Sequence, residues 1–471
     1  MAIISASVFL SKNSYQLLYK IARTFTGCRI HSLSLGSPSL VVHRQSRSIS
    51  SNTNAITKSE GKEAEIPQAS EFLKYLRQRI KATGAITVAE YMQECLTNPY
   101  YGYYSRKNPF GRQGDFITSP EVCQIFGELV ALWCVNEWNI SNIGAVPFQI
   151  IELGPGTGTL AYDMLRILKS FPQIGNTVSL HLVERSSELA RQQAKKLGIE
   201  AIDQTWLTGA GKGTVEGAVD GPVDGAGDVL HYQTGISQFG IPVYWYQRIQ
   251  DIPKGAPAFI VANEFFDALP IHKLQMTDGK LREVLVDVTE DDSRLRFVIA
   301  PNETAAVRLV PKESRKRQHL ELSVEAGVVL NDIADRVTDH GGGALIIDYG
   351  HDGTKTDTFR AFQHHKVLDP LHEPGQADVT ADVDFSLLRQ MLRPKAISYG
   401  PITQSTFLFN MAFEQRFNAL MKACKSDEEQ DRLAAACDVL INPAKMGGQF
   451  FVFAVFGWKR GRLGPVTGGF Q

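Results

Sequence analysis

The feature that most constrains this chain is a glycine-rich segment, residues 150–158, with the sequence IIELGPGTG. An apolar run at 148–153 leads into it, and a stretch with helical spacing of apolar residues, 160–169, follows it. Between a strand and a helix, such glycines let the backbone turn sharply and approach a ligand closely, because no Cβ intervenes. The segment therefore predicts a nucleotide-type binding loop in an α/β fold.

Beyond Pro147 the chain alternates between short apolar runs and helical patterns. We expect further strands at 178–183, 243–246, 258–262, 344–348 and 449–458, and a further helix at 187–197. This alternation is typical of a parallel sheet that helices cover on both faces. The predicted fold class is therefore α/β, with a doubly wound and mostly parallel sheet.

The length of 471 residues exceeds what one ordinary core holds, so we expect several units. Residues 59–145 are predicted to form a helical N-terminal region. Its loop at 114–118 can fold as a lid over a cofactor and substrate pocket, and the alternative is an ordinary turn with Ser119 as a helix cap. The sheet domain is expected to span 146–458, with a flexible glycine-rich insertion at 208–229. A C-terminal tail, 459–471, follows it.

The N-terminus differs from the rest of the chain in charge. Its first 59 residues contain no Asp or Glu, yet they carry seven Lys and Arg among many serines. This composition is typical of a mitochondrial transit peptide, which we assign to residues 1–58. A disordered basic tail is the alternative. Without the segment the net charge falls to about −8, which argues against a general nucleic-acid binder.

Metal sites and membrane spans are not indicated by the sequence. The six cysteines form no C-x-x-C pair and have no matching histidine spacing, so neither a zinc site nor a disulfide framework is predicted. The longest apolar run, 450–458, is far shorter than the roughly 18 residues that cross a bilayer. We therefore expect no bound metal and no membrane span.

The spacing within the glycine loop separates two nucleotide chemistries. A dinucleotide site would need G-x-G-x-x-G/A, and Thr159 stands where its third small residue would lie. The observed order is Glu152, Gly154, Gly156 and Gly158, an acid followed by alternating glycines. This order resembles the first motif of the doubly wound methyltransferases, in which the loop surrounds the methionine part of S-adenosylmethionine.

A second acid supports a ribosylated cofactor. Glu184 ends the strand predicted at 178–183, where a carboxylate can accept hydrogen bonds from both hydroxyls of a ribose. NAD enzymes use the same geometry, so Glu184 by itself does not identify a methyl donor. We take Glu152, the three glycines and Glu184 as the candidate cofactor ligands.

Several blocks of the sequence, spread over residues 70–458, resemble the MidA-like mitochondrial methyltransferases that act as complex I assembly factors. In the family's order, the matching segments are 114–121 (GDFITSPE), 126–128, the glycine loop, 262–270 (ANEFFDALP), 347–351 (IDYGH), 374–375, Asp378, Thr380 and 383–385. One visible departure is Thr157, where many members carry Arg.

What the resemblance implies is a seven-stranded methyltransferase sheet and a protein arginine methyltransferase that uses S-adenosylmethionine. The implied product is symmetric dimethylarginine on a core subunit of complex I, which places the protein in the mitochondrial matrix. The resemblance implies no nucleic-acid partner, and it leaves a homodimer open.

The carboxylates after the strand predicted at 258–262 are the main catalytic candidates. Glu264 and Asp267 lie at the sheet edge where ligands of such folds bind. Two carboxylates there can hold a planar guanidinium bidentately and polarise the attacking nitrogen. Asp115 and Asp348 are the second catalytic candidates, and Asp115 is also a candidate cofactor contact. The alternative is that Glu264 or Asp267 caps a following helix.

Two other classes of protein remain as alternatives. One is a catalytically silent assembly chaperone that binds S-adenosylmethionine but transfers no methyl group. It would have no chemical need for both the glycine loop and the acidic pair. The other is an NAD-dependent oxidoreductase, which the threonine at position 159 disfavours.

The N-terminal assignment predicts a result for import. Residues 1–59, fused to a fluorescent reporter, should carry the reporter into mitochondria, because the membrane potential draws in an acid-free segment that bears arginines. A matched fusion with the four Arg residues of this segment changed to Gln should stay in the cytosol. A cytosolic wild-type fusion would contradict the assignment.

Overall fold

A computed structural model describes residues 71–106, 117–141, 144, 146–199, 231–363, 366–392, 395–461 and 467–470. All of these residues belong to the second of two compact units, residues 70–471. The predicted transit peptide, 1–58, and the predicted insertion, 208–229, lie outside the described residues.

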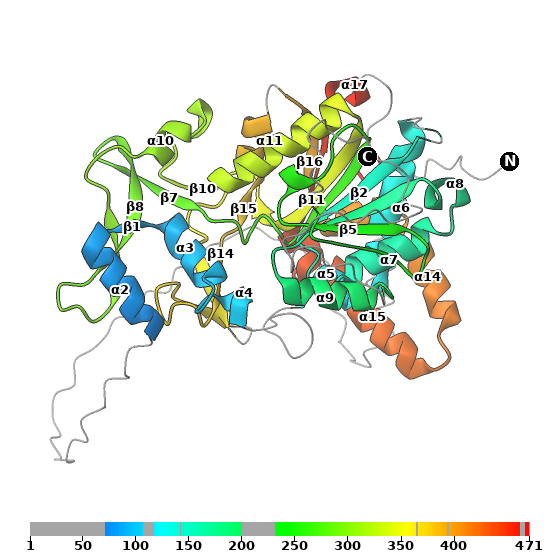
Figure 1. Cartoon of the computed structure of the whole chain (residues 1–471), viewed down its shortest axis with the longest axis horizontal. Coiled ribbons are helices and arrows are strands. Elements are labelled where there is room, and N and C mark those ends of the chain that lie inside the picture. The colour runs from blue at the N-terminus through cyan, green and yellow to red at the C-terminus, as the bar shows by residue number, and fades with distance from the viewer. Residues whose placement is uncertain are drawn as a thin grey trace, which may run out of the picture. The chain divides into compact units, whose positions relative to one another are not determined.

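The strand that leads into the glycine loop lies at the centre of the largest sheet (Figure 1). This strand, β2 (Phe148–Leu153), pairs in parallel with β3 (Val178–Val183) on one side and β6 (Ala258–Asn263) on the other. Two more parallel strands extend the sheet, β5 (Pro242–Tyr246) beside β3 and β11 (Gly342–His351) beside β6. The predicted strands at 148–153 and 178–183 are confirmed to the residue.

The edges of this sheet correct the strand number expected from the resemblance. Within the described residues it has nine strands rather than seven, and it is mixed: five pairings are parallel and three antiparallel. The outer strands are β17 (Phe450–Phe456), β16 (Ile397–Thr403), β4 (Gln233–Ile236) and β15 (Val383–Asp384). The short β4 and β15 carry too few apolar residues to stand out as strands in the sequence.

Both faces of the central strands are buried, which explains their continuous apolar runs. Successive side chains of a strand point to opposite faces. Ile150 therefore packs with α6 (Gln124–Ile140), α7 (Thr159–Leu168) and α9 (Ser187–Lys196). Ile151 packs on the other face with α11 (Val324–Asp339) and α12 (Phe385–Leu392). Helices therefore pack against both faces of the central strands.

Two smaller sheets are insertions that the sequence analysis did not resolve. A five-stranded sheet pairs β1 (Ile86–Thr87) with four strands from the segment between β6 and β11. These strands are β7 (His272–Thr277), β8 (Lys280–Val288), β9 (Leu295–Ile299) and β10 (His319–Leu322). A three-stranded sheet holds β12 (Arg360–Gln363), β13 (Lys366–Leu368) and β14 (Asp378–Thr380).

The described part of the predicted N-terminal region, 59–145, is mostly helical. It comprises α2 (Glu71–Thr83), α3 (Val88–Thr97) and the short α4 (Tyr103–Arg106). The apolar faces of α2 and α3 share one core with residues of the five-stranded and three-stranded sheets. Helices α5 (Ser119–Val122) and α6 come directly before β2. Between β16 and β17 the chain forms α13 (Gln404–Asn410), α14 (Phe413–Ala423), α15 (Asp427–Ile441) and the short α16 (Met446–Gln449).

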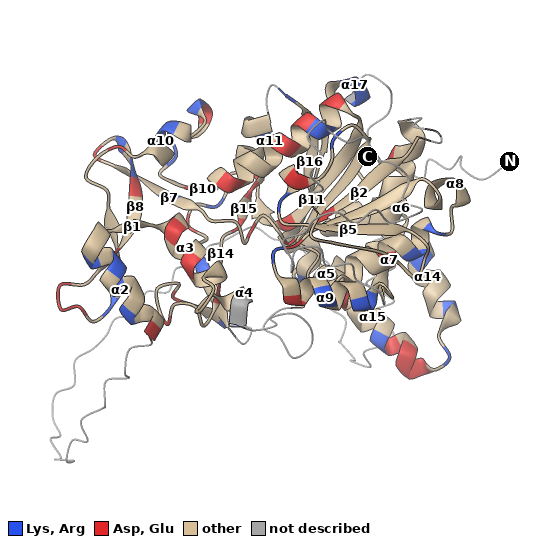
Figure 2. Cartoon of the chain, viewed as in Figure 1, with Lys and Arg blue, Asp and Glu red and all other residues tan. Residues whose placement is uncertain are grey.

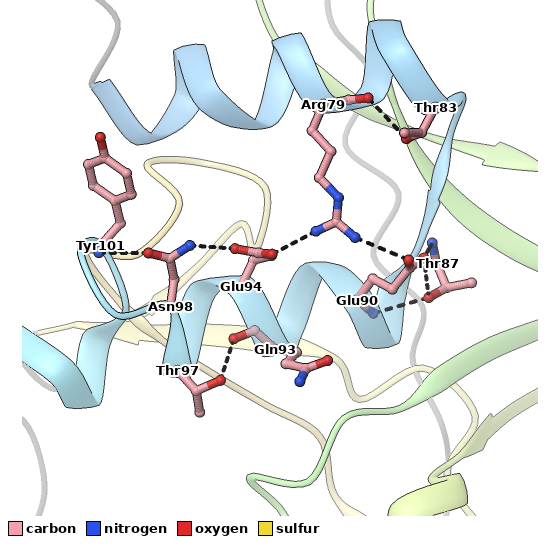
Figure 3. Close-up of polar contacts among 9 residues, drawn as sticks. All are labelled: Arg79, Thr83, Thr87, Glu90, Gln93, Glu94, Thr97, Asn98 and Tyr101. Atoms are coloured by element: carbon pink, nitrogen blue, oxygen red, sulfur yellow. Dashed lines mark hydrogen bonds and ion pairs between the residues drawn. The ribbon is translucent and has the colours of Figure 1, made fainter. Parts of the chain in front are cut away.

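A row of polar contacts fixes α2 on α3 and shapes the turn that follows (Figure 3). Arg79 on α2 donates hydrogen bonds to Glu94 and Glu90 on α3, at 2.7 and 3.2 Å. Glu94 accepts a further bond from the side-chain amide of Asn98, and the amide oxygen of Asn98 accepts the backbone N–H of Tyr101. The turn leading into α4 is therefore anchored to both helices.

Charged side chains of both signs are interspersed along the described helices and strands (Figure 2). Among the described helices, none is both long enough and apolar enough to span a bilayer.

Candidate functional site

A cavity of about 350 Å³ opens where β2, β6 and β11 end. Its walls come from the glycine loop, from the residues after β6, and from α4, α5, β12 and β14. Parallel strands bring their carboxyl ends to the same edge of a sheet, and ligands of such folds bind there. The order of the strands in the sheet therefore brings the glycine loop and the acidic segment after β6 together.

All three glycines of the loop have a backbone conformation that side chains disfavour. Gly154, Gly156 and Gly158 have φ values of 66°, 52° and 80°. A Cβ on Gly154 would lie 2.9 Å from a ring carbon of Phe265, and one on Gly158 would lie 3.2 Å from Cα of Gln193. Glycine is therefore required at these two positions because other parts of the chain approach them closely, and not only because a ligand does.

Glu152 is buried at the end of β2 and lines the cavity. Burial, together with the neighbouring Glu184 carboxylate, raises the pKa of Glu152 to about 8. Its Oε2 atom accepts no hydrogen bond from any described residue. A buried carboxylate that lacks a hydrogen-bond donor is stabilised by a ligand that brings N–H or O–H donors or positive charge.

Glu184 ends β3 but does not line the cavity. Its Oε1 accepts the backbone N–H of Ser186 at 2.7 Å, and its Oε2 accepts the side-chain amide of Gln193 at 3.0 Å. Burial raises the pKa of this carboxyl above its usual value. Each oxygen has capacity for one more hydrogen bond, so a ribose contact is compatible with this arrangement.

Gln193 is a positioning residue that the sequence analysis missed. It is fully buried on α9, and its Oε1 accepts the indole N–H of Trp245 at 2.8 Å. Because an indole can only donate, the amide nitrogen must face the other way. It donates to the carbonyl of Gly156 at 2.8 Å and to Glu184. One side chain therefore ties the glycine loop to the candidate ribose acid.

Glu264 follows β6 directly and lines the cavity. Its φ of 53° is left-handed, a conformation that costs a non-glycine residue about 1–2 kcal/mol. Its Oε1 accepts the backbone N–H of Ser119 at 2.9 Å and the amide of Asn263 at 3.1 Å. Burial is the main reason that the pKa of Glu264 rises to about 8. Strain held at a cavity wall points to a functional role.

Asp267 lies on the same cavity wall, and no helix follows it. The alternative that Glu264 or Asp267 caps a helix is therefore wrong, since the chain runs from this turn into β7. The side chain of Thr380 donates to Asp267 Oδ2 at 3.2 Å. Burial raises the pKa of Asp267 to about 6, against the lowering effect of the Thr380 hydrogen bond and of nearby Arg360.

Asp348 lies beneath this acidic turn rather than in the cavity wall. It is fully buried, and its Oδ2 accepts the backbone N–H groups of Phe265, Phe266 and Asp267 at 3.2, 2.9 and 3.3 Å. Burial and the adjacent carboxylates, first that of Asp267, raise its pKa well above the usual value. Asp348 therefore holds the turn on which Glu264 and Asp267 lie.

The other candidate residues, and the cavity residues that the sequence analysis did not identify, lie as follows. Asp115 lies outside the described residues. His351 does not line the cavity, and its Nδ1 faces the backbone N–H of Lys355. Cavity residues that the sequence analysis did not assign as site residues are Tyr104, Glu121, Tyr349 and Arg360, and the motif residues Asp378 and Thr380 join them. They come from elements far apart in sequence, although Glu121 lies in the segment 114–121 and Tyr349 in the segment 347–351 that carry the family resemblance.

The described residues contain no group of three or more His, Cys, Asp and Glu side chains arranged to hold a metal ion. Among the described residues that line the cavity, Arg360 is the only basic side chain, against five acids: Glu121, Glu152, Glu264, Asp267 and Asp378. The cavity is therefore suited to positively charged ligands.

Comparison with known proteins gives a consistent result. A family described as S-adenosyl-L-methionine-dependent methyltransferases matches residues 129–402. A relative named protein arginine methyltransferase NDUFAF7, mitochondrial, from Danio rerio is 44% identical over 82% of this chain and 87% of its own length. The protein of the same name from Homo sapiens is 43% identical, over 85% and 87%. A Drosophila melanogaster homolog is 44% identical, over 81% and 84%.

A solved structure shares the fold. It is a protein from Burkholderia thailandensis bound to S-adenosyl-homocysteine, with 23% sequence identity and a TM-score of 0.63. The similarity covers 84% of this chain and 93% of that one.

Because of the Gln193 contacts, we expect a substitution of Gln193 to lower the stability of the protein. The same substitution of the neighbouring Gln192 should not lower it. Gln193→Met keeps the length of the side chain but removes the partner of the buried Trp245 Nε1 and of the part-buried Gly156 carbonyl. The free energy of unfolding should fall by about 2 kcal/mol or more, because each such group costs about 1–3 kcal/mol. Urea unfolding measures this. Gln192→Met on the same helix is the control, and equal stability of the two variants would contradict the assignment.

Proposed function

The chain belongs to this family of S-adenosyl-L-methionine-dependent methyltransferases, and on that premise we propose that it methylates arginine side chains of a protein substrate. The observation that carries the proposal is the pair of carboxylates, Glu264 and Asp267, on the cavity wall beside the glycine loop. The relatives named as protein arginine methyltransferases support it, since they match this chain over most of its length.

The glycine-loop end of the cavity fits the cofactor. S-adenosylmethionine carries an ammonium group, a sulfonium and two ribose hydroxyls, and Glu152 offers a buried oxygen with no donor among the described residues. We assign the cofactor to Glu152 and the three glycines of the loop, with Glu184 as the ribose ligand. When bound, the cofactor supplies an electrophilic methyl group. Asp115 remains a predicted contact.

The carboxylates after β6 fit a guanidinium substrate. A guanidinium is planar and cationic, and its nitrogen attacks poorly while its lone pair is delocalised. Glu264 and Asp267 can hold two of its edges, keep the positive charge away from the attacking nitrogen and align that nitrogen. Glu264 Oε1 is already occupied by Ser119 and Asn263, so Oε2 is the oxygen left to face the substrate.

Proton transfer completes the assignment of roles. The attacking nitrogen loses one proton after it gains the methyl group, and a nearby base must accept that proton. A carboxyl with a pKa near the working pH serves best as such a base. Glu264, with its pKa of about 8, meets this condition better than Asp267, with its pKa of about 6. Asp348 is then a positioning residue, since it holds the turn rather than the substrate.

The substrate and location follow from the sequence resemblance, not from the cavity. We propose a core subunit of complex I as the substrate, symmetric dimethylarginine as the product and the mitochondrial matrix as the compartment. The relatives named mitochondrial support the organelle. Mass spectrometry of complex I subunits from cells with and without this protein should show one dimethylated arginine that depends on it. Equal modification in both would contradict this substrate.

Neutral variants of the two carboxylates test the catalytic assignment. Glu264→Gln and Asp267→Asn keep the shape of the side chains but remove the charge that orients and polarises the guanidinium. Single-turnover methyl transfer should fall by about 10²-fold or more, because the lost stabilisation acts at the barrier. Binding of S-adenosylhomocysteine, measured by calorimetry, should change little.

A matched control separates this effect from loss of fold. Glu283→Gln neutralises a buried acid outside the cavity, so it should lower the thermal midpoint and leave methyl transfer intact. The wild-type kcat/KM should rise with pH towards about 8, since the free enzyme must lose the Glu264 proton, and Glu264→Gln should remove that rise. Full transfer by both carboxylate variants would exclude them from the mechanism.

A further inference from the structure

Three buried oxygen atoms on residues that line the cavity have no hydrogen-bond donor among the described residues. They are Glu121 Oε2, Glu152 Oε2 and Asn263 Oδ1, and none accepts a hydrogen bond from any described residue. Glu152 is 3% exposed and Asn263 is 8% exposed, and all three residues line the cavity. They come from α5, from β2 and from the end of β6, which pairs with β2.

The neighbouring contacts fix which atoms are unsatisfied. Asn263 donates its amide nitrogen to Glu264 Oε1 at 3.1 Å, and that acceptor requires a donor, so the free atom is the amide oxygen. Glu121 accepts the hydroxyl of Thr157 on its Oε1 at 3.0 Å, which leaves Oε2. The unsatisfied atoms are therefore one amide oxygen and two carboxyl oxygens, and all three accept hydrogen bonds when the carboxyl groups are ionised.

These acceptors determine the chemistry of the ligand that suits them. A phosphate or carboxylate would bring more acceptors to a wall that already lacks donors. A primary ammonium brings three N–H donors and one positive charge, which matches three acceptor atoms. The methionine part of S-adenosylmethionine carries such an ammonium, whereas its sulfonium carries charge but no donor.

We propose that Glu121 is a cofactor-binding residue, which together with Glu152 and Asn263 binds the α-ammonium of the methionine part of the cofactor. The proposal rests on the cofactor assignment made above. It gives a role to the segment 117–121, whose end joins two parts of the site. Ser119 donates its backbone N–H to Glu264, and Glu121 accepts from Thr157 of the glycine loop. The turn that begins α5 thus contacts both the cofactor loop and the acidic turn.

Ligands that differ in their amino-acid part test the proposal by calorimetry. S-adenosylhomocysteine keeps the α-ammonium and lacks the sulfonium charge, and 5′-methylthioadenosine lacks both. Glu121→Gln keeps an oxygen for Thr157 and replaces a charged acceptor by an amide. We expect its affinity for S-adenosylhomocysteine to fall about tenfold or more, because a charge-assisted hydrogen bond is lost. Its affinity for 5′-methylthioadenosine should equal that of the wild type.

Every other outcome contradicts the proposal. Equal losses for both ligands would mean that Glu121 only shapes the glycine loop. A greater loss for S-adenosylmethionine than for S-adenosylhomocysteine would place Glu121 at the sulfonium, and unchanged affinities would remove it from the site. Glu188→Gln, which neutralises an exposed acid on α9, controls for the general loss of negative charge. Failure of arginine methylation by the wild type would overturn the proposed function but leave this binding result standing.

Discussion

The carboxylate of Asp348 is the contact on which the rest of the site depends. One of its oxygens accepts three consecutive backbone N–H groups, from Phe265, Phe266 and Asp267, and so bends the chain directly after β6. Glu264, at the start of the bend, takes a left-handed conformation that it would not adopt in isolation. Three hydrogen bonds of this kind offset part of that strain. Asp348 therefore helps to fix Glu264 and Asp267, together with the bonds from Ser119 and Asn263 to Glu264 and from Thr380 to Asp267.

This arrangement gathers acids that repel one another in a space with little water. Burial is the largest cause of the raised pKa of Glu152, Glu264, Asp267 and Asp348, and neighbouring carboxylates add to it for Glu152, Glu264 and Asp348. Cations entering the cavity would relieve both effects. The cofactor and a guanidinium each carry positive charge. The clustered carboxyl groups of the site therefore favour the binding of both ligands.

The sequence predicted the parts of this site that depend on local pattern. The glycine loop, the strands at 148–153 and 178–183 and the acidic segment after β6 all carry signals within about ten residues of sequence. Gln193 and Glu121 could not be found in this way, because their roles come from contacts with Trp245 and Thr157, which lie 52 and 36 positions away. The same limit applies to Asp348, which looked catalytic at a strand end and proved to lie beneath the turn. The two short strands β4 and β15 escaped prediction because their register depends on neighbours in the sheet.

A crystal structure of the protein with S-adenosylhomocysteine tests the central claim most directly, namely that one cavity aligns the methyl donor with the acidic turn. The account predicts the ligand's sulfur on the cavity side of the glycine loop, facing the open space beside Glu264 and Asp267. It also predicts clear hydrogen bonds from the turn of residues 265–267 to Asp348, as in the ligand-free state. A sulfur that faces away from Glu264, or a ligand bound outside this cavity, would contradict it.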